Sequence, residues 1–275
     1  MAFKKILPLL GMRVHYQEQL PHSIDWRERG AVTPVKDQKS CGGCWAFATV
    51  AVVEGINMII TGNLSELSVQ ELLDCSRDGG NDGCIGGYTD MALEYIAKYG
   101  IHTAEYYPYR GSDGQCREHN SKLVVTLDGY DLVLPAYDER ELMKIVAKQP
   151  VVVNIDSSDV SFQTYTSGIY HGPCGTKLDH SLTIVGYGVD GNKSYWIAKN
   201  SWGRAWGEDG YIRMERNLND TGPGVCGIAM EARYPVKRTQ NHFSIPPTSS
   251  STKFLFSIVY MFIILLGINI TVFLL

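Results

Sequence analysis

One cysteine in this chain stands where a thiol becomes reactive. Cys44 is the second cysteine of the string QKSCGGCW. It directly precedes an apolar, proline-free run, WAFATVAVVEGINMII. If that run is a helix, the unpaired backbone N–H groups and the dipole at its start favour an anion. The thiol pKa then falls and the nucleophilic thiolate forms near neutral pH. On local sequence alone, a structural disulfide cysteine or half of a redox Cys-x-x-Cys pair explains the string equally well.

A nucleophilic thiolate needs a proton-transfer partner, and the partner needs an orienting group. Of the seven histidines, His180 differs because it enters a β-branched run, SLTIV, where a sheet would hold its ring. Asn200 follows another strand-like segment and precedes the triplet SWG. Its side-chain amide would accept from one imidazole nitrogen and leave the other facing the sulfur. Taken singly, a strand histidine and a turn asparagine are ordinary structural residues.

Several separated blocks, in the correct order, resemble the papain-like cysteine proteases. His180 lies 136 positions after Cys44 (180 − 44) and Asn200 lies 156 after it (200 − 44), close to the spacing of roughly 130–150 residues in that family. The blocks are QKSCGGCWAF, GCIGGY, DHSLTIVGYG and KNSWG, with the start LPHSIDWRERGAVTPVKDQ and the end CGIAMEARYPV. The resemblance covers residues 20–236 and implies a peptidase domain.

The resemblance implies a role for each site residue. Cys44 would attack the peptide carbonyl as a thiolate paired with protonated His180. The Gln38 side-chain amide and the Cys44 backbone N–H would bind the oxyanion. Asn200 would orient the imidazole, and Trp202 would shield that hydrogen bond from solvent. A thioester acyl-enzyme would form and be hydrolysed, with no metal and no cofactor.

Substrate-binding residues follow from the same matched positions. Gly86 and Gly87 would form a shelf for an extended substrate backbone. The pocket for the second residue before the cleaved bond would welcome apolar side chains at Leu178, and Glu231 would accept a basic group or point to solvent. We therefore predict broad specificity with a polar-tolerant pocket. The remaining residues of this predicted substrate site are Tyr88, Thr89, Asn154, Asp179, Ser181 and Trp202.

The seven cysteines indicate an oxidising compartment. An odd count leaves at least one thiol unpaired if the others form disulfides, and four Asn-x-Ser/Thr sequons occur, at Asn63, Asn192, Asn219 and Asn269. Together they favour a glycoprotein of the secretory pathway, in a lysosome or vacuole or outside the cell. A zinc site would need a second short-spaced ligand pair, and Cys75 to Cys84 is too wide for one. The resemblance implies the pairs Cys41–Cys84, Cys75–Cys116 and Cys174–Cys226, which leave Cys44 free.

The elements that must position these residues change in type along the chain. The first half is helical in pattern: the run after Cys44, a segment opening at Ser68 with a capping box, and Asp90–Tyr99, which stops at Gly100. Asp138–Lys148 is a further predicted helix, ended by a proline. The second half reads as strands, at Val151–Ile155, Ser181–Tyr187, Tyr195–Ile197 and Gly210–Met214. Helices followed by strands predict an α+β protein of two lobes, and the resemblance implies a helical left lobe, an antiparallel barrel-like right lobe and the active-site cleft between them.

Composition and the two ends define the remaining organisation. The chain of 275 residues has a net charge of −4, and its lack of long Lys/Arg runs argues against a nucleic-acid partner. We predict a short extension over 1–19, the peptidase domain over 20–236, a Ser/Thr/Pro-rich linker over 237–253 and an uncharged apolar tail over 254–275. Twenty-two helical residues span about 33 Å, enough for a bilayer core. The tail is therefore a candidate membrane anchor or a cleaved hydrophobic signal.

Two departures from the family pattern motivate an alternative function. Gly43 stands where relatives carry serine or alanine, and about nineteen residues precede the mature-like start, where relatives have a pro-segment of about a hundred. The alternative is an inactive, membrane-tethered or truncated homologue, or one that only binds ligands. Intact Cys44, His180, Asn200 and Gln38 argue for the enzyme. The expected partners are polypeptide substrates and cystatin-type protein inhibitors, and the catalytic domain is expected to be monomeric.

Overall fold

The computed structural model of the protein describes residues 19–117, 125–217 and 222–240. The predicted tail over 254–275 and the sequons at Asn219 and Asn269 lie outside them, as do nearly all of the N-terminal extension and of the linker. The described helices are α1 (Cys44–Thr61), α2 (Val69–Cys75), α3 (Thr89–Tyr99), α4 (Glu139–Val146), α5 (Val160–Gln163) and the 3₁₀ turn η1 (Val225–Gly227). The strands are β1 (Ile24–Asp25), β2 (Gly129–Leu132), β3 (Val151–Ile155), β4 (Ile169–Tyr170), β5 (His180–Asp190), β6 (Lys193–Lys199), β7 (Tyr211–Glu215) and β8 (Ala232–Val236).

The helices begin and end where their local sequence dictates. The Ser68 side chain accepts from the backbone N–H of Glu71 and caps α2. Asp138 caps α4 by accepting from the backbone N–H groups of Arg140 and Glu141. Helix α3 ends at Gly100, whose φ of 77° suits glycine best. The predicted helices Asp90–Tyr99 and Asp138–Lys148 are confirmed to within two residues at each end, and the predicted opening of a helix at Ser68 is confirmed as the start of α2.

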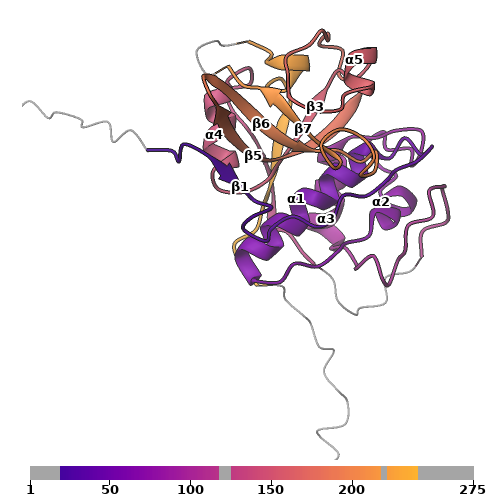
Figure 1. The fold of residues 1–275 in the computed structure, drawn as a ribbon. Helices are drawn as coiled ribbons and strands as arrows, with labels where there is room; N and C mark the ends of the chain where they lie inside the picture. The colour runs from indigo at the N-terminus through magenta and orange to yellow at the C-terminus, as the bar shows by residue number, and fades with distance from the viewer. Residues whose placement is uncertain (1–18, 118–124, 218–221, 241–275) are drawn as a thin grey trace, which may run out of the picture. The chain divides into compact units, whose positions relative to one another are not determined.

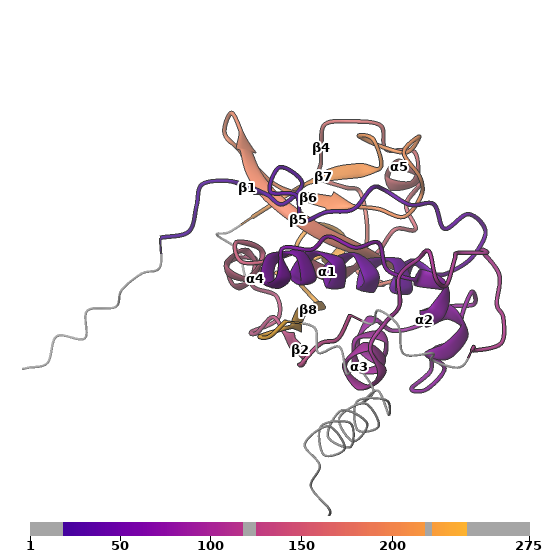
Figure 2. The same ribbon diagram turned by 90° about the horizontal axis from the view of Figure 1, so that it is seen from below.

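Helix α1 is the central helix of the molecule. Figure 2 shows it running between the strands β5 and β6 on one side and α3 on the other, and it packs against both β5 and α3. Among the described helices, α1 has the length and apolarity of a membrane span, but 67% of it is buried within the domain. Its high content of apolar residues is therefore explained by burial within the domain.

The strands form one sheet in the order β2-β8-β3-β5-β6-β7-β4, with β1 added on β5. Its pairs are antiparallel apart from β4 with β7, which is parallel. The predicted α+β class is confirmed, and the sheet is open, with β2 and β4 at its ends, rather than closed into a barrel. A side chain at Gly186 would lie 2.2 Å from the carbonyl oxygen of Ile24. Only glycine there lets β1 pair with β5.

Two clusters of buried side chains correspond to the two predicted lobes. One cluster fills the sheet side and includes Leu182, Ile184, Trp196, Ile212 and Met214. The other surrounds α1, α2 and α3 and includes Trp45, Val53, Leu72, Leu93 and Ile96. In Figure 1 the strands gather above the first three helices. The predicted nucleophile and its histidine come from different lobes, because Cys44 begins α1 and His180 begins β5.

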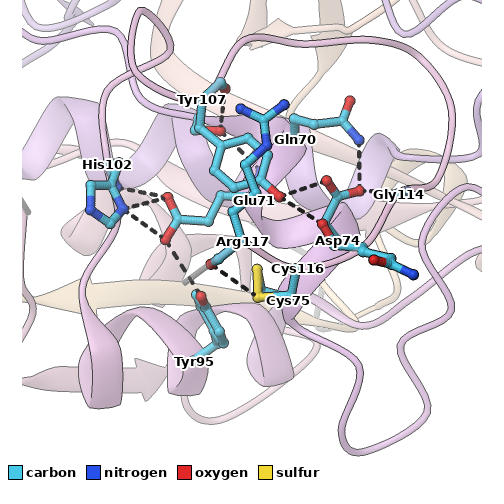
Figure 3. The surroundings of a disulfide bond; sticks show 12 residues. Gln70, Glu71, Asp74, Cys75, Tyr95, His102, Tyr107, Gly114, Cys116 and Arg117 are labelled. Carbon is cyan, nitrogen blue, oxygen red and sulfur yellow. Dashed lines mark hydrogen bonds and ion pairs between the residues drawn. A yellow bond between two sulfur atoms is a disulfide. The ribbon is translucent and has the colours of Figure 1, made fainter. Parts of the chain in front are cut away.

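The buried carboxylates of α2 accept hydrogen bonds from the loop over 101–117 (Figure 3). The Asp74 carboxylate accepts from the Tyr107 hydroxyl at 2.7 Å, from the Arg110 guanidinium at 2.6 Å and from the Gly114 backbone N–H at 2.8 Å. The Glu71 carboxylate accepts from the backbone N–H of His102 at 2.9 Å. Because buried carboxylates cost free energy unless hydrogen-bonded, these contacts hold the loop over 101–117 on the helices.

Candidate active site

Cys44 is the first residue of α1 and is half-buried. Its preceding residue, Gly43, makes no side-chain cap. In the first turn of α1, the backbone N–H of Trp45 is hydrogen-bonded to the Cys44 thiol. All seven cysteines lie in the described residues; six form disulfides and Cys44 is free. Since Cys41 pairs with Cys84 and not with Cys44, the alternative of a redox Cys-x-x-Cys pair does not hold.

Cys44 and His180 shift each other's pKa in opposite directions. Burial by itself raises the pKa of the Cys44 thiol, but the hydrogen bond and charge of His180, with the N–H groups of Ser181 and Trp45, lower it below its ordinary value. Burial likewise lowers the pKa of His180, but the hydrogen bond and charge of Cys44, with Asn200 and Asp179, raise it above its ordinary value. The pair therefore favours a thiolate beside an imidazolium.

Asn200 fixes the orientation of the His180 ring. The Nε2 atom of His180 lies 2.8 Å from the Oδ1 atom of Asn200, and both residues are buried. The same oxygen accepts from the backbone N–H of Ser201 at 2.8 Å. With Nε2 engaged, the imidazole presents Nδ1 to the sulfur of Cys44. The Trp202 ring lies 4.7 Å from the His180 ring between centroids and covers this pair.

Gln38 is held in one orientation from two sides. Its Nε2 donates to the carbonyl oxygen of Cys41 at 2.8 Å, and its Oε1 accepts from the Ser201 hydroxyl at 2.6 Å. A carbonyl can only accept, so the amide nitrogen must face Cys41. One N–H of that nitrogen is engaged and the other is left for a further acceptor. Tyr109 also donates to the backbone carbonyl of Gln38 at 2.8 Å.

The three disulfides are the pairs that the family resemblance implies: Cys41–Cys84, Cys75–Cys116 and Cys174–Cys226. The first joins the turn before Cys44 to the segment that carries Gly86 and Gly87. The backbone N–H of Gly42 donates to the carbonyl of Cys84 at 2.8 Å in the same place. The nucleophile's turn and the predicted substrate shelf are therefore one cross-linked unit.

The predicted shelf has features that suit close backbone approach. Gly86 has a φ of +154°, and a side chain at Gly87 would lie 2.6 Å from Asn81 Oδ1 and 2.7 Å from the Trp45 ring. Tyr88 is 61% exposed beside them. Thr89 begins α3 and is only 2% exposed.

Asn154, Ser181 and Glu231 form one hydrogen-bonded chain. The Ser181 hydroxyl donates to Asn154 Oδ1 at 2.8 Å, and Asn154 Nδ2 donates to Glu231 Oε2 at 2.9 Å. The same Glu231 oxygen accepts from Arg233 at 3.2 Å. Leu178 is half-buried next to this group in sequence, and Asp179 accepts from the backbone and hydroxyl of Ser157.

Sequence reasoning missed two residues that the geometry makes important. Ser201 fixes the Gln38 amide, and its only sequence signal is its place directly after Asn200. Arg233 forms an ion pair with Glu231, which lies directly before strand β8, and the short spacing of two residues between opposite charges is its sequence signal. Strand β8, which carries Arg233, was not predicted from the sequence as a strand, and its residues appear only within the block CGIAMEARYPV.

Comparison with known proteins decides the family. The family model "Papain family cysteine protease" matches residues 20–236. The chain belongs to the papain family of cysteine proteases. It is 52% identical over 238 residues to the oryzain beta chain of Oryza sativa subsp. japonica. The aligned region covers 86% of this chain and 50% of the oryzain beta chain. It is 52% identical over 225 residues to zingipain-2 of Zingiber officinale, covering 82% of this chain and 100% of zingipain-2.

Solved structures agree with this papain-family assignment. The Carica candamarcensis cysteine protease CMS1MS2, solved in complex with E-64, is 47% identical with a TM-score of 0.73, covering 80% of this chain and 100% of that chain. This protein spans about half the length of the oryzain beta chain.

Proposed function

We propose that this protein is a cysteine endopeptidase that hydrolyses peptide bonds through a thioester acyl-enzyme. The observation that carries the proposal is the opposed pKa shift of Cys44 and His180, oriented by Asn200 at 2.8 Å. A nucleophile, a proton-transfer partner and an orienting group are the parts that covalent peptide hydrolysis requires. Family membership supports the same reaction class.

The reaction starts from the Cys44 thiolate and the protonated His180 imidazolium. The Cys44 thiolate attacks the peptide carbonyl carbon, and the carbonyl oxygen takes the negative charge. The free N–H of the Gln38 amide and the Cys44 backbone N–H bind this oxyanion. His180 donates its Nδ1 proton to the leaving amine, and the thioester remains. His180 then takes a proton from water as the water attacks the thioester, and the acid is released.

Compartment, oligomeric state and protein inhibitors belong to the same proposal. The three disulfides support folding in an oxidising, secretory compartment. We propose that residues 20–236 are the peptidase domain, that it acts as a monomer, and that cystatin-type protein inhibitors bind it. Glycosylation and membrane association through 254–275 remain proposals from sequence. An inactive homologue is disfavoured because the reactive pair retains its geometry.

Active-site labelling tests the proposed function. A peptidyl epoxide probe should label the wild-type protein covalently with one probe per chain, and label neither Cys44→Ser nor His180→Ala at a comparable rate. His171→Ala is the matched control, because the His171 side chain is exposed whereas His180 is buried, and it should label normally. A folded, reduced wild type that takes no label and cleaves no peptide would overturn the assignment.

We further propose that the pocket around Glu231 favours neutral over basic side chains. Asn154 and Arg233 both donate to Oε2 of Glu231, and the positive charge of Arg233 offsets the negative charge that would attract a substrate cation. Arg233 also lies 3.6 Å from Asp90 and is 15% exposed, which keeps it in place.

Reporter peptides test this preference. Wild type should cleave Phe-Arg reporters faster than Arg-Arg reporters, and Glu231→Ala should leave that ratio within about twofold, as expected for an exposed ion pair. Arg233→Met frees the carboxylate and should raise Arg-Arg cleavage relative to Phe-Arg. A selective loss of Arg-Arg cleavage in Glu231→Ala would show instead that Glu231 binds the basic group.

A further inference from the structure

A small cavity lies behind Asn200, on the side of α1 that faces the sheet. Its volume is about 20 Å³. Most of its lining residues are buried, and apart from Lys36 they come from α1, β5 and the segment over 199–201. A cavity needs roughly 10–15 Å³ to hold one water molecule, and the water needs two to four polar partners. The lining residues are Lys36, Phe47, Ala48, Ala51, Glu54, Ser181, Thr183, Lys199, Asn200 and Ser201.

Asn200 brings an unsatisfied donor to this cavity. Its Oδ1 accepts from His180 and from the Ser201 backbone, but within the described residues its Nδ2 has no hydrogen-bond partner. The residue is only 3% exposed. Reversing the amide does not help, because Nδ2 would then face the Ser201 N–H, which can only donate. A buried donor without a partner is costly.

Lys199 and Glu54 bring charge to the same cavity. The Lys199 ammonium donates to the backbone carbonyl of Thr33 at 2.8 Å and to the Thr33 hydroxyl at 3.0 Å, which leaves a third proton. Burial lowers the pKa of Lys199 to about 8, so it is charged at neutral pH. The Glu54 carboxylate accepts from Lys36 at 2.9 Å, from the Leu67 backbone at 2.8 Å and from the Thr33 hydroxyl at 2.6 Å.

We propose that one water molecule occupies this cavity and joins Asn200 to the buried charges of Lys199 and Glu54. The water accepts from Asn200 Nδ2 and from the third Lys199 proton, and it donates to Glu54. One N–H of Asn200 Nδ2 is then hydrogen-bonded, which helps to fix the amide that orients His180. Lys199 and Glu54 become positioning residues for the reaction, so this inference rests on the proposed function.

A crystal structure at high resolution tests the water directly and does not depend on activity. The expected result is one well-ordered water within hydrogen-bonding distance of Asn200 Nδ2 and Lys199 Nζ. A dry cavity, or a rotated Asn200 that bonds a protein acceptor through Nδ2, would overturn the proposal. If the protein proves to be no protease, this measurement still stands by itself.

Two isosteric substitutions at Ala48 test the positioning role. Ala48 lines the cavity and is buried. Ala48→Val and Ala48→Thr both displace the water, and because their shapes match, any crowding is common to both. The threonine hydroxyl can accept from Asn200 and the valine methyl cannot. We expect kcat of Ala48→Val to be about tenfold below that of Ala48→Thr, with KM values within twofold.

The pH profile separates positioning from a loss of folded protein. Epoxide titration counts the competent sites in each variant, and kcat is expressed per titrated site. The alkaline limb of Ala48→Val should move to lower pH than that of Ala48→Thr, because a loosened Asn200 supports the imidazolium less. Equal kcat and equal limbs in the two variants would contradict the positioning role.

Discussion

Reactivity at Cys44 depends on a balance between burial and a few directed hydrogen bonds. Burial opposes the charged form of both Cys44 and His180, yet each charge stabilises the other enough to reverse the net shift. Because the two groups interact strongly, the apparent pKa values of a rate profile belong to the pair. Activity is expected between a lowered thiol pKa and a raised imidazole pKa.

Replacing Asn200 by alanine tests the contribution of the orienting amide. Asn200 helps raise the pKa of His180, so its removal lowers that pKa and the alkaline limb of kcat/KM moves to lower pH. Loss of a hydrogen bond to a charged group costs about 1.5–3 kcal/mol, or roughly a 10- to 150-fold lower rate. The check is a pH–rate series with the wild type. An unchanged limb with a lower rate would mean that Asn200 acts on something other than the imidazolium.

Individual residues differed in how far the sequence could place them. Cys44, His180 and Asn200 were predicted by ordered family blocks, although each is ambiguous alone. Ser201 and Arg233 were not. Ser201 matters through its hydrogen bond to Gln38, which is distant in sequence, and Arg233 matters through a carboxylate oxygen that it shares with the distant Asn154. The sequence does not decide whether Glu231 binds a basic substrate group, for the same reason. The availability of a carboxylate depends on its neighbours in space.

At the scale of elements, α1 carries the nucleophile and must pack closely on every side. At Gly55, an added methyl group would lie 2.8 Å from Pro150 Cγ and 3.2 Å from the backbone oxygen of Ala31. The proline ring cannot rotate away. This explains a glycine in the middle of a helix, where alanine is normally preferred.

Gly55→Ala should therefore lower stability in spite of better helix propensity. The propensity gain is about 1 kcal/mol, and overpacking costs about 1–3 kcal/mol. We expect a lower melting temperature, measured by calorimetry, with Pro150→Ala as the single control. The double variant Gly55→Ala/Pro150→Ala should be more stable than the sum of the singles predicts. A higher melting temperature for Gly55→Ala alone would refute the clash.

Helices whose ends are marked by capping residues could be predicted from the sequence. Short strands that form only by pairing with a distant segment could not. Ser68, Asp138 and Gly100 mark helix ends by side-chain or backbone properties that the sequence shows directly. The short strands β1 and β4 have two residues each and exist only through distant partners. The sheet order, its open edges and the parallel β4–β7 pair depend on contacts between distant segments, which no local window contains.

At the scale of the whole molecule, two of the disulfides join segments with different roles, one at the candidate active site and one in a structural hydrogen-bond network. Cys41–Cys84 and Cys75–Cys116 close loops of similar length, with sequence separations of 43 and 41. The chain-entropy model then assigns each about 4 kcal/mol. Their surroundings differ: the first joins the turn before Cys44 to the substrate shelf, whereas the second lies by the network of Asp74 and Tyr107 (Figure 3).

Removing each disulfide should therefore give similar losses of stability and different losses of activity. We expect Cys41→Ser/Cys84→Ser and Cys75→Ser/Cys116→Ser each to lower the melting temperature by about 8–16 °C. Only the first pair frees the shelf from the nucleophile's turn, so its KM should rise about tenfold or more, since misplacement of about 1 Å can cost 100-fold. The second should keep KM within about twofold, so it controls for general loosening. Assays belong well below both melting temperatures, with sites counted by epoxide titration. Equal effects of the two pairs on KM would mean that the cross-link at Cys41 stabilises the fold without positioning the substrate.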